Sequence, residues 1–291
     1  MAQRDPSLLL LIPAYNEADR IEPVLTDYAR YFRANYQGKF VLLVVLNGCR
    51  DNTRAVVERV ASENPNLCFV EFHEPIGKGG ALIEGLKYAP LADFIGYVDA
   101  DGATAPAAFH DLIKLADQAD CVIASRWLPG AVLHQSQTQQ RRFASRVFHL
   151  IVQLLFWMDI RDTQCGAKIM SRAAVQQIHS SLCIADMAFD INLLYAVKRA
   201  GFKILEVPTE WTDKAGSKVV LGRTSLTMLL SVLRLRVIHS PFRGLFRLFH
   251  PIEEWAYMKL RAPLRRAPEE KKEPEKAKEL EQAKEPDDKK Q

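Results

Sequence analysis

The strongest constraint on the fold is an alternation of apolar runs and amphipathic stretches over the first 125 residues. Apolar runs at 7–15 and 39–47 and strand-like stretches at 67–72, 92–101 and 119–126 are separated by segments with apolar residues at helical spacing. Strands that are buried on both faces give such runs, and the helices between them complete the βαβ units of a parallel sheet. We therefore predict an α/β fold with a mostly parallel central sheet and helices on both faces.

The same periodicity predicts where the helices lie. They are expected at 17–36, 51–64, 77–89, 105–118 and about 142–158, with an irregular polar loop over 127–145 and a short strand at 203–211. We predict one α/β domain over 1–222, an amphipathic basic helical segment over 223–262, and a disordered charged tail over 263–291, where large apolar residues are almost absent.

Charge and cysteine content narrow the possible partners and the compartment. The net charge is +4, while the last 25 residues hold seven Lys against nine Asp or Glu, so the body of the chain is basic. A basic body suits anionic partners such as nucleotides, phosphorylated lipids, membrane surfaces or nucleic acid. Five cysteines without C-x-x-C spacing, and no evident secretory leader, predict reduced thiols in a cytoplasmic compartment.

Polar stretches follow several of the apolar runs. PAYNE, NGCRDN, DADG and SRW all fall where parallel strands would end, which is the edge at which such sheets bind ligands. In DADG, Asp99 and Asp101 flank Ala100 and precede Gly102. Two carboxylates so placed could form a turn or hold Mg²⁺ or Mn²⁺, and the pair alone favours neither interpretation.

The neighbouring stretches add ligand-binding candidates. Tyr15 could stack on a base, Glu17 could accept hydrogen bonds from a base or ribose, and Asn47 could pair with a base edge. Lys78, in GKGGAL, would lie near a helix start that welcomes an anion. The structural alternatives are a carboxylate in a first helical turn for Glu17 and a helix cap for Asp51. Walker A and G-x-G-x-x-G patterns are missing, which argues against a P-loop NTPase and a dinucleotide dehydrogenase.

Eight short stretches together resemble one family. PAYNE, NGCRDNT, GKGGAL, DADG, SRW, RDTQCGAK, AFDINLLY and EWTDKAGSK occur in the order seen in family 2 glycosyltransferases of the GT-A fold. Over about 7–240 the chain resembles the dolichyl-phosphate β-glucosyltransferases, and next the dolichyl-phosphate mannose synthases. The resemblance implies an inverting, metal-dependent transfer of a hexose from a nucleotide sugar, UDP-glucose first, to a polyprenyl or dolichyl phosphate. GDP-mannose as donor, or a glycan or soluble acceptor, are the alternatives.

The resemblance also implies roles for individual residues. The nucleotide-sugar-binding positions are Pro13, Ala14, Tyr15, Glu17, Asn47, Lys78, Asp99, Ala100, Gln164 and Lys168. Asp99 and Asp101 would hold Mg²⁺ or Mn²⁺, and Asp190, Arg126 and Lys218 would be catalytic. Asp190 would face the sugar or the acceptor, and Lys218 would lie in a loop that closes over the donor. The chain departs from the family at Asn47, where Asp is usual, and at Ala167, where an aromatic residue is usual.

A lipid acceptor would require contact with a membrane. Arg141, Arg142 and Ser145 are candidates for binding the acceptor phosphate, and a solvated basic helix face is the alternative for the arginines. In 221–261, basic residues recur at helical spacing opposite apolar ones, which suits a helix in the interface of an anionic membrane. We predict a peripheral protein on the cytoplasmic face of a membrane. No nucleic-acid-binding motif is present, and the intact Asp pair and cations argue against a non-enzymatic binding protein.

Overall fold

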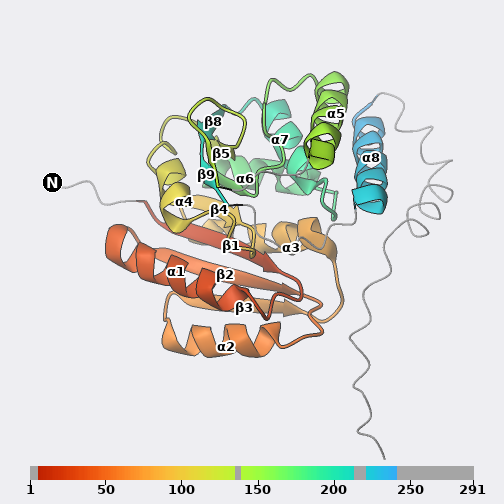
Figure 1. Ribbon diagram of the computed structural model, residues 1–291. Coiled ribbons are helices and arrows are strands. Elements are labelled where there is room, and N and C mark those ends of the chain that lie inside the picture. The colour runs from red at the N-terminus through yellow and green to blue at the C-terminus, as the bar shows by residue number, and fades with distance from the viewer. Residues whose placement is uncertain (1–5, 135–138, 213–220, 241–291) are drawn as a thin grey trace, which may run out of the picture.

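A computed structural model describes residues 6–134, 139–212 and 221–240, with the side chains of 139–144 and 221–226 excepted (Figure 1). Its centre is a seven-stranded sheet in the order β3-β2-β1-β4-β7-β5-β8. Its strands are β1 (Leu8–Ala14), β2 (Phe40–Asn47), β3 (Leu67–Phe72), β4 (Phe94–Val98), β5 (Cys121–Ser125), β7 (Ala167–Ser171) and β8 (Ile204–Pro208). Neighbouring strands are parallel except at β7, which is antiparallel to both β4 and β5. The predicted mostly parallel sheet is confirmed.

Helices cover both faces of this sheet (Figure 1). One face packs against α1 (Ile21–Asn35), α2 (Thr53–Glu63) and α4 (Pro106–Ile113). The other packs against α3 (Gly77–Leu86), α5 (Gln139–Phe156), α6 (Arg172–Ile178), α7 (Phe189–Arg199) and α8 (Leu221–Ile238). Short 3-10 turns, η1 (Ala89–Leu91) and η2 (His179–Ser181), complete the connections.

The alternation of side chains along β1 explains why this strand is apolar throughout. Leu8, Leu10 and Ile12 belong to the core beneath α1 and α4, while Leu9 and Leu11 belong to the core beneath α3 and α7. Successive side chains of a strand point to opposite faces, so a central strand between two helical layers must be apolar at every position.

Two parts of the fold differ from the sequence-based prediction. The predicted loop over 127–145 contains β6 (Val132–Leu133), which pairs in parallel with β9 (Glu210–Trp211), and the start of α5. Backbone hydrogen bonds from Val132 N–H to Thr209 O and from His134 N–H to Trp211 O, both 3.1 Å, hold it in place. The prediction of an irregular loop is therefore wrong for these positions, because an edge pairing supplies partners that the polar sequence does not reveal.

The described part of the proposed membrane segment packs on the α/β domain. α8 lies beside α5, and its Val232 and Leu235 are fully buried in the core shared with α5 and α7 (Figure 1). Residues 241–262 and the tail over 263–291 lie outside the described residues, so both domain boundaries stay predictions. Among the described helices, none combines the length and the apolar character needed to cross a bilayer.

Candidate active site

The loops after β1 and β2 form one hydrogen-bonded platform at the carboxyl edge of the sheet. Asn16 has a φ of 54°, a left-handed conformation that Asn tolerates better than most residues. Its Oδ1 accepts a hydrogen bond from the backbone N–H of Arg50 at 2.8 Å, and the N–H of Glu17 donates to Thr53 Oγ1 at 2.7 Å. Asp51 Oδ1 accepts from the N–H of Thr53 at 3.0 Å, so Asp51 orders the first residue of α2, while Asn52 rather than Asp51 occupies the N-cap position.

Among the residues predicted to bind the nucleoside, Glu17 and Asn47 already make contacts within the protein. Tyr15 is half-buried, and the Glu17 carboxylate is held by the Arg20 guanidinium, with Arg20 Nη2 3.0 Å from Glu17 Oε1. Asn47 is buried, and its Oδ1 accepts from the N–H of Ile76 at 2.7 Å. The amide of Asn47 therefore fixes the turn before α3, and its direct pairing with a base edge stays a prediction.

Asp99 directly follows β4 and lies against the backbone of Gly166. A Cβ added at Gly166 would lie 2.1 Å from Asp99 Oδ2, so a side chain there would displace the carboxylate. Gly102 has a φ of +70°, and Asp101 Oδ1 accepts from the N–H of Ala103 at 3.0 Å. The turn at Gly102 and the position of the Asp101 carboxylate are thus one feature, because the hydrogen bond from Ala103 N–H within this turn orders the Asp101 side chain.

Glycines at the start of α3 bring Lys78 to these carboxylates. Gly77 has a φ of +82°, and a Cβ at Gly77 or Gly79 would come within 2.4 Å of the carbonyl oxygens of Ala185 or Ile184. The close approach carries the first turn of α3 against the segment before α7. Lys78 Nζ then lies 2.6 Å from Asp99 Oδ1 and 3.7 Å from Asp190 Oδ2.

Lys168 and Asp190 form a buried ion pair next to Lys78 and Asp99. Lys168 is 0% exposed and Asp190 is 2% exposed, and Lys168 Nζ lies 2.6 Å from Asp190 Oδ1. The Tyr97 hydroxyl also donates to Asp190, and Lys168 Nζ donates to Cys165 O at 2.5 Å. Burial alone would raise the pKa of Asp190, but the charges of Lys168 and Lys78 outweigh it, so the pKa is lowered and the carboxylate is ionised at neutral pH.

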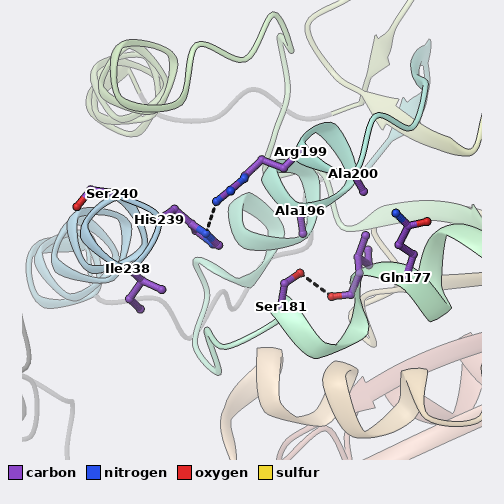
Figure 2. Close-up of a pocket in the computed structure, with 9 residues that line it drawn as sticks. Gln177, Ser181, Ala196, Arg199, Ala200, Ile238, His239 and Ser240 are labelled. Carbon is purple, nitrogen blue, oxygen red and sulfur yellow. Dashed lines mark hydrogen bonds between the residues drawn. The ribbon is translucent and has the colours of Figure 1, made fainter. Parts of the chain in front are cut away.

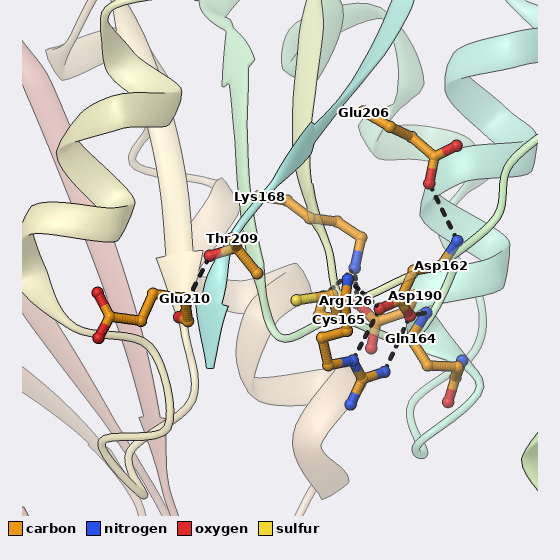
Figure 3. A network of polar contacts seen from close by, with 9 residues as sticks. All are labelled: Arg126, Asp162, Gln164, Cys165, Lys168, Asp190, Glu206, Thr209 and Glu210. Atoms are coloured by element: carbon orange, nitrogen blue, oxygen red, sulfur yellow. Dashed lines mark hydrogen bonds and ion pairs between the residues drawn. The ribbon is translucent and has the colours of Figure 1, made fainter. Parts of the chain in front are cut away.

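A second ion pair lies beside it at the end of β5 (Figure 3). Arg126 donates from Nε and Nη2 to Asp162 at 2.7 and 2.9 Å, in bidentate geometry, and its guanidinium lies 4.9 Å from the centre of the Trp211 ring. Burial would raise the pKa of the Asp162 carboxyl, but the hydrogen bonds from Arg126 lower it. Nearby, the buried Nε2 of Gln164 is a donor without a hydrogen-bond partner within the described residues, and binding of a ligand oxygen by Gln164 stays a prediction.

The donor set of Asp99 and Asp101 fits a hard divalent cation. Carboxylate oxygens are the ligands that Mg²⁺ and Mn²⁺ prefer. Within the ranges that the structure describes, no group of three or more His, Cys, Asp or Glu side chains forms a complete cage. Mg²⁺ commonly uses one or two carboxylates and takes its other ligands from substrate phosphates and water. The pair therefore fits a cation that is shared with a diphosphate.

The structure gathers most, but not all, of the predicted site residues. Tyr15, Glu17, Asn47, Lys78, Asp99, Asp101, Arg126, Gln164, Lys168 and Asp190 come from the carboxyl edge and the elements beside it. Ala14 and Ala100 are buried, so a ligand would meet their backbone, and Pro13 is half-buried. Lys218 and the side chains of Arg141 and Arg142 lie outside the described residues. Ser145 is half-buried on α5, one turn before His149, whose ring packs on Trp127.

Sequence reasoning missed three residues that organise the site: Arg20, Tyr97 and Asp162. Asp162 had a signal, because it lies in RDTQCGAK beside the assigned Gln164. Tyr97 and Arg20 had none, because a Tyr in an apolar strand and an Arg before a helix are common features whose partners only the fold reveals.

A separate cavity of about 720 Å³ opens between α6, α7 and α8 (Figure 2). Its lining includes Arg199, whose Nη1 lies 2.6 Å from His239 Nδ1. Arg199 precedes β8, whose first residue pairs with Cys121 at the amino edge of the sheet, away from Asp99. Since α6, α7 and α8 all end here, the positive charge of Arg199 compensates the helix dipoles. We therefore place the active site at the carboxyl edge instead.

The fold is of the GT-A type, as comparison with solved structures supports. Glucosyl-3-phosphoglycerate synthase from Mycobacterium tuberculosis, solved with UDP, superposes with a TM-score of 0.59 at 18% identity, over 81% of this chain and 82% of that one. A crystal structure of that synthase with Mn²⁺, UDP and glucosyl-3-phosphoglycerate gives the same score. At this identity the likeness shows the fold alone.

Sequence comparison shows the family. The model of glycosyl transferase family 2 matches residues 10–178, and the chain belongs to that family. The human dolichyl-phosphate beta-glucosyltransferase is 30% identical over 231 residues, 73% of this chain and 69% of the human protein. The Saccharomyces cerevisiae enzyme of that name is 28% identical over 82% of this chain and 76% of its own length. Glycosyltransferase AglD of Haloferax volcanii is 30% identical over 77% of this chain, which spans 36% of AglD.

Proposed function

We propose that this glycosyltransferase moves glucose from UDP-glucose to the phosphate of a polyprenol such as dolichol, with inversion at the sugar carbon and with Mg²⁺ or Mn²⁺. The observation that carries the proposal is the ion pair of Lys78 with Asp99, two residues from Asp101 at the carboxyl edge, in a family 2 chain whose relatives are named for this reaction. The UDP and Mn²⁺ of the solved structures support the choice of donor and cation.

The proposed transfer depends more on positively charged groups that stabilise the phosphates than on a general base that deprotonates the acceptor. A phosphate monoester has a second pKa near 6, so the acceptor is largely a dianion at neutral pH and needs little deprotonation. When bound, a divalent cation would neutralise the charge that develops on the leaving diphosphate. Arg126 and Lys78 would add to this stabilisation. Asp190, buried and bound by Lys168, would position the sugar or the acceptor rather than remove a proton.

We further propose that α5 contacts the membrane that holds the acceptor. Four apolar residues at helical spacing share an exposed face that runs to the end of α5 and the residue after it: Val147 (41% exposed), Leu150 (55%), Leu154 (68%) and Trp157 (81%). Trp157 follows the helix with a φ of 53°, an unusual conformation for a bulky residue. Tryptophan is enriched at membrane interfaces, and the exposed Arg146 near this face suits an anionic surface.

Transfer is tested with purified protein, a short polyprenyl phosphate, Mg²⁺ or Mn²⁺, and either UDP-glucose, other UDP-hexoses or GDP-mannose. We expect release of UDP from UDP-glucose that depends on the lipid phosphate and that Asp101→Asn abolishes. Asp111→Asn, in an exposed ion pair on α4, is the matched control and should retain activity. Release only with GDP-mannose, or only with a soluble acceptor, would refute this proposal.

Membrane contact is tested by sedimentation with liposomes that contain anionic lipid. Leu150→Glu with Leu154→Glu should strongly reduce binding, because each change places a charge on the proposed contact face. Leu91→Glu is the control, since Leu91 is 76% exposed but lies on η1. Equal binding by the α5 variant and the wild-type protein would refute the assignment of α5.

A further inference from the structure

We propose that Lys78 is a built-in competitor of the divalent cation at Asp99, so that the cation and the nucleoside diphosphate bind together rather than one after the other. This inference rests on the proposed function, because it takes a nucleotide sugar and a divalent cation as the ligands. It assigns to Lys78 a role in the loading and unloading of the site, beyond simple attraction of an anion.

The geometry places the ammonium where a cation would bind. Lys78 Nζ lies 2.6 Å from Asp99 Oδ1, and Asp190 Oδ2 is its second acidic neighbour at 3.7 Å. A divalent ion that coordinates this oxygen of Asp99 must take the place of the ammonium, because two cations cannot both contact it without strong repulsion. A lysine side chain is protonated at neutral pH, so this competitor carries a positive charge.

Of the two lysines in this cluster, Lys78 is the one that can move. Lys168 is fully buried and bound to Asp190 and to the Cys165 carbonyl. The Lys78 side chain is 16% exposed, and it extends from a helix start whose backbone is fixed by the hydrogen bond from Gly80 N–H to Ala185 O at 3.1 Å. Only rotation of the side chain is needed to release Asp99, while α3 stays in place.

The diphosphate supplies the new partner for Lys78. Its negative charges attract the ammonium away from Asp99, and they bring the oxygen ligands that complete the coordination of a cation held by only one or two carboxylates. Each ligand therefore favours the binding of the other, which is a coupling free energy between two ligands. After transfer, the departure of the nucleoside diphosphate returns Lys78 to Asp99 and expels the cation.

The test measures Mn²⁺ binding by electron paramagnetic resonance, without any sugar or acceptor. Lys78→Met should bind Mn²⁺ alone about tenfold more tightly than the wild-type protein, because a positive charge next to the ligand is removed. In the presence of UDP, the wild-type protein should gain Mn²⁺ affinity severalfold more than Lys78→Met does. Lys87→Met removes an exposed lysine just after the same helix, paired with Glu84 at 2.6 Å, and should match the wild-type protein in both measurements.

Lys78→Arg keeps the positive charge and should bind Mn²⁺ alone as weakly as the wild-type protein. Near-UV circular dichroism checks the fold of each variant, and Lys78→Gln replaces Lys78→Met if the latter does not fold. Mn²⁺ binding to the neutral variant that is equal to or weaker than wild-type binding would overturn the proposal, as would an unchanged effect of UDP. Because Mn²⁺ alone is the first probe, a failure to transfer glucose to polyprenyl phosphate would leave this result interpretable.

Discussion

Replacing Lys168 with Met tests whether the buried ion pair holds the site together. The substitution keeps a flexible side chain of similar length in a position that is 0% exposed, and it removes one charge. Asp190 then keeps the Tyr97 hydroxyl and the more distant Lys78, at 3.7 Å, as its partners. An uncompensated carboxylate is left in the interior, and the protein must either unfold more easily or protonate it.

The expected cost follows from this burial. Breaking a buried ion pair by removing one partner destabilises a protein by about 3–5 kcal/mol, against about 0–1 kcal/mol for an exposed pair. For a domain of this size each kcal/mol lowers the melting temperature by about 2–4 °C, so Lys168→Met should lower it by roughly 10 °C. The matched control is Lys114→Met, whose exposed pair with Asp111 spans 2.7 Å and whose loss should shift the melting temperature by less than about 4 °C.

Urea unfolding followed by circular dichroism measures both variants at pH 7 and pH 5. The deficit of Lys168→Met should shrink at pH 5, because the pKa of Asp190 rises when Lys168 is lost and protonation then relieves the buried charge. The double variant Lys168→Met with Asp190→Leu should be more stable than Lys168→Met alone, because both charges are gone. A loss below about 1 kcal/mol for Lys168→Met, or no recovery in the double variant, would refute the reasoning.

Three further predictions concern the site and its surroundings. Gly166→Ala should reduce metal-dependent transfer by about 100-fold while the protein stays folded by circular dichroism, because the new Cβ would lie 2.1 Å from Asp99 Oδ2 and displace it; activity near the wild-type level would contradict this. Asn47→Asp should change the free energy of unfolding by less than about 1 kcal/mol in urea titrations, since a carboxylate can also accept the hydrogen bond from Ile76; a larger loss would show that the Asn47 amide N–H groups matter. The pKa values of Asp162 and Asp190 are lowered in the folded protein, so their stabilisation is complete above about pH 5 and is lost as the pH falls below about 4. Asp162→Asn should therefore flatten the fall in the free energy of unfolding between pH 5 and pH 3, and an unchanged slope would count against a lowered pKa.

The sequence predicts the parallel half of the sheet well, for a physical reason. β1 and β2 are continuous apolar runs, β3 and β4 are strand-like stretches, and the polar side chains that follow these strands lie at one edge once the strands are parallel. Asp99 and Lys78 could be assigned to one site on this basis. The ion pair between Lys168 and Asp190 could not, because it joins a strand to a helix 22 residues further along, and nothing in local periodicity reports such a contact. The exposed apolar face of α5 also escaped prediction, because its residues resemble core residues until the packing is known.

The antiparallel direction of β7 is what joins the two halves of the site. An antiparallel strand begins where its parallel neighbours end, so Ala167 pairs with Val98 at the carboxyl edge. The segment before β7 therefore enters the site instead of leaving it, and it brings Asp162 to Arg126, Gly166 to Asp99 and, one residue into the strand, Lys168 to Asp190. A parallel β7 would place these residues at the opposite edge, next to the amino end of β4. The stretch RDTQCGAK thus serves the site through the direction of a single strand, which explains why its residues contact both carboxylates, Asp99 and Asp190, that Lys78 bridges.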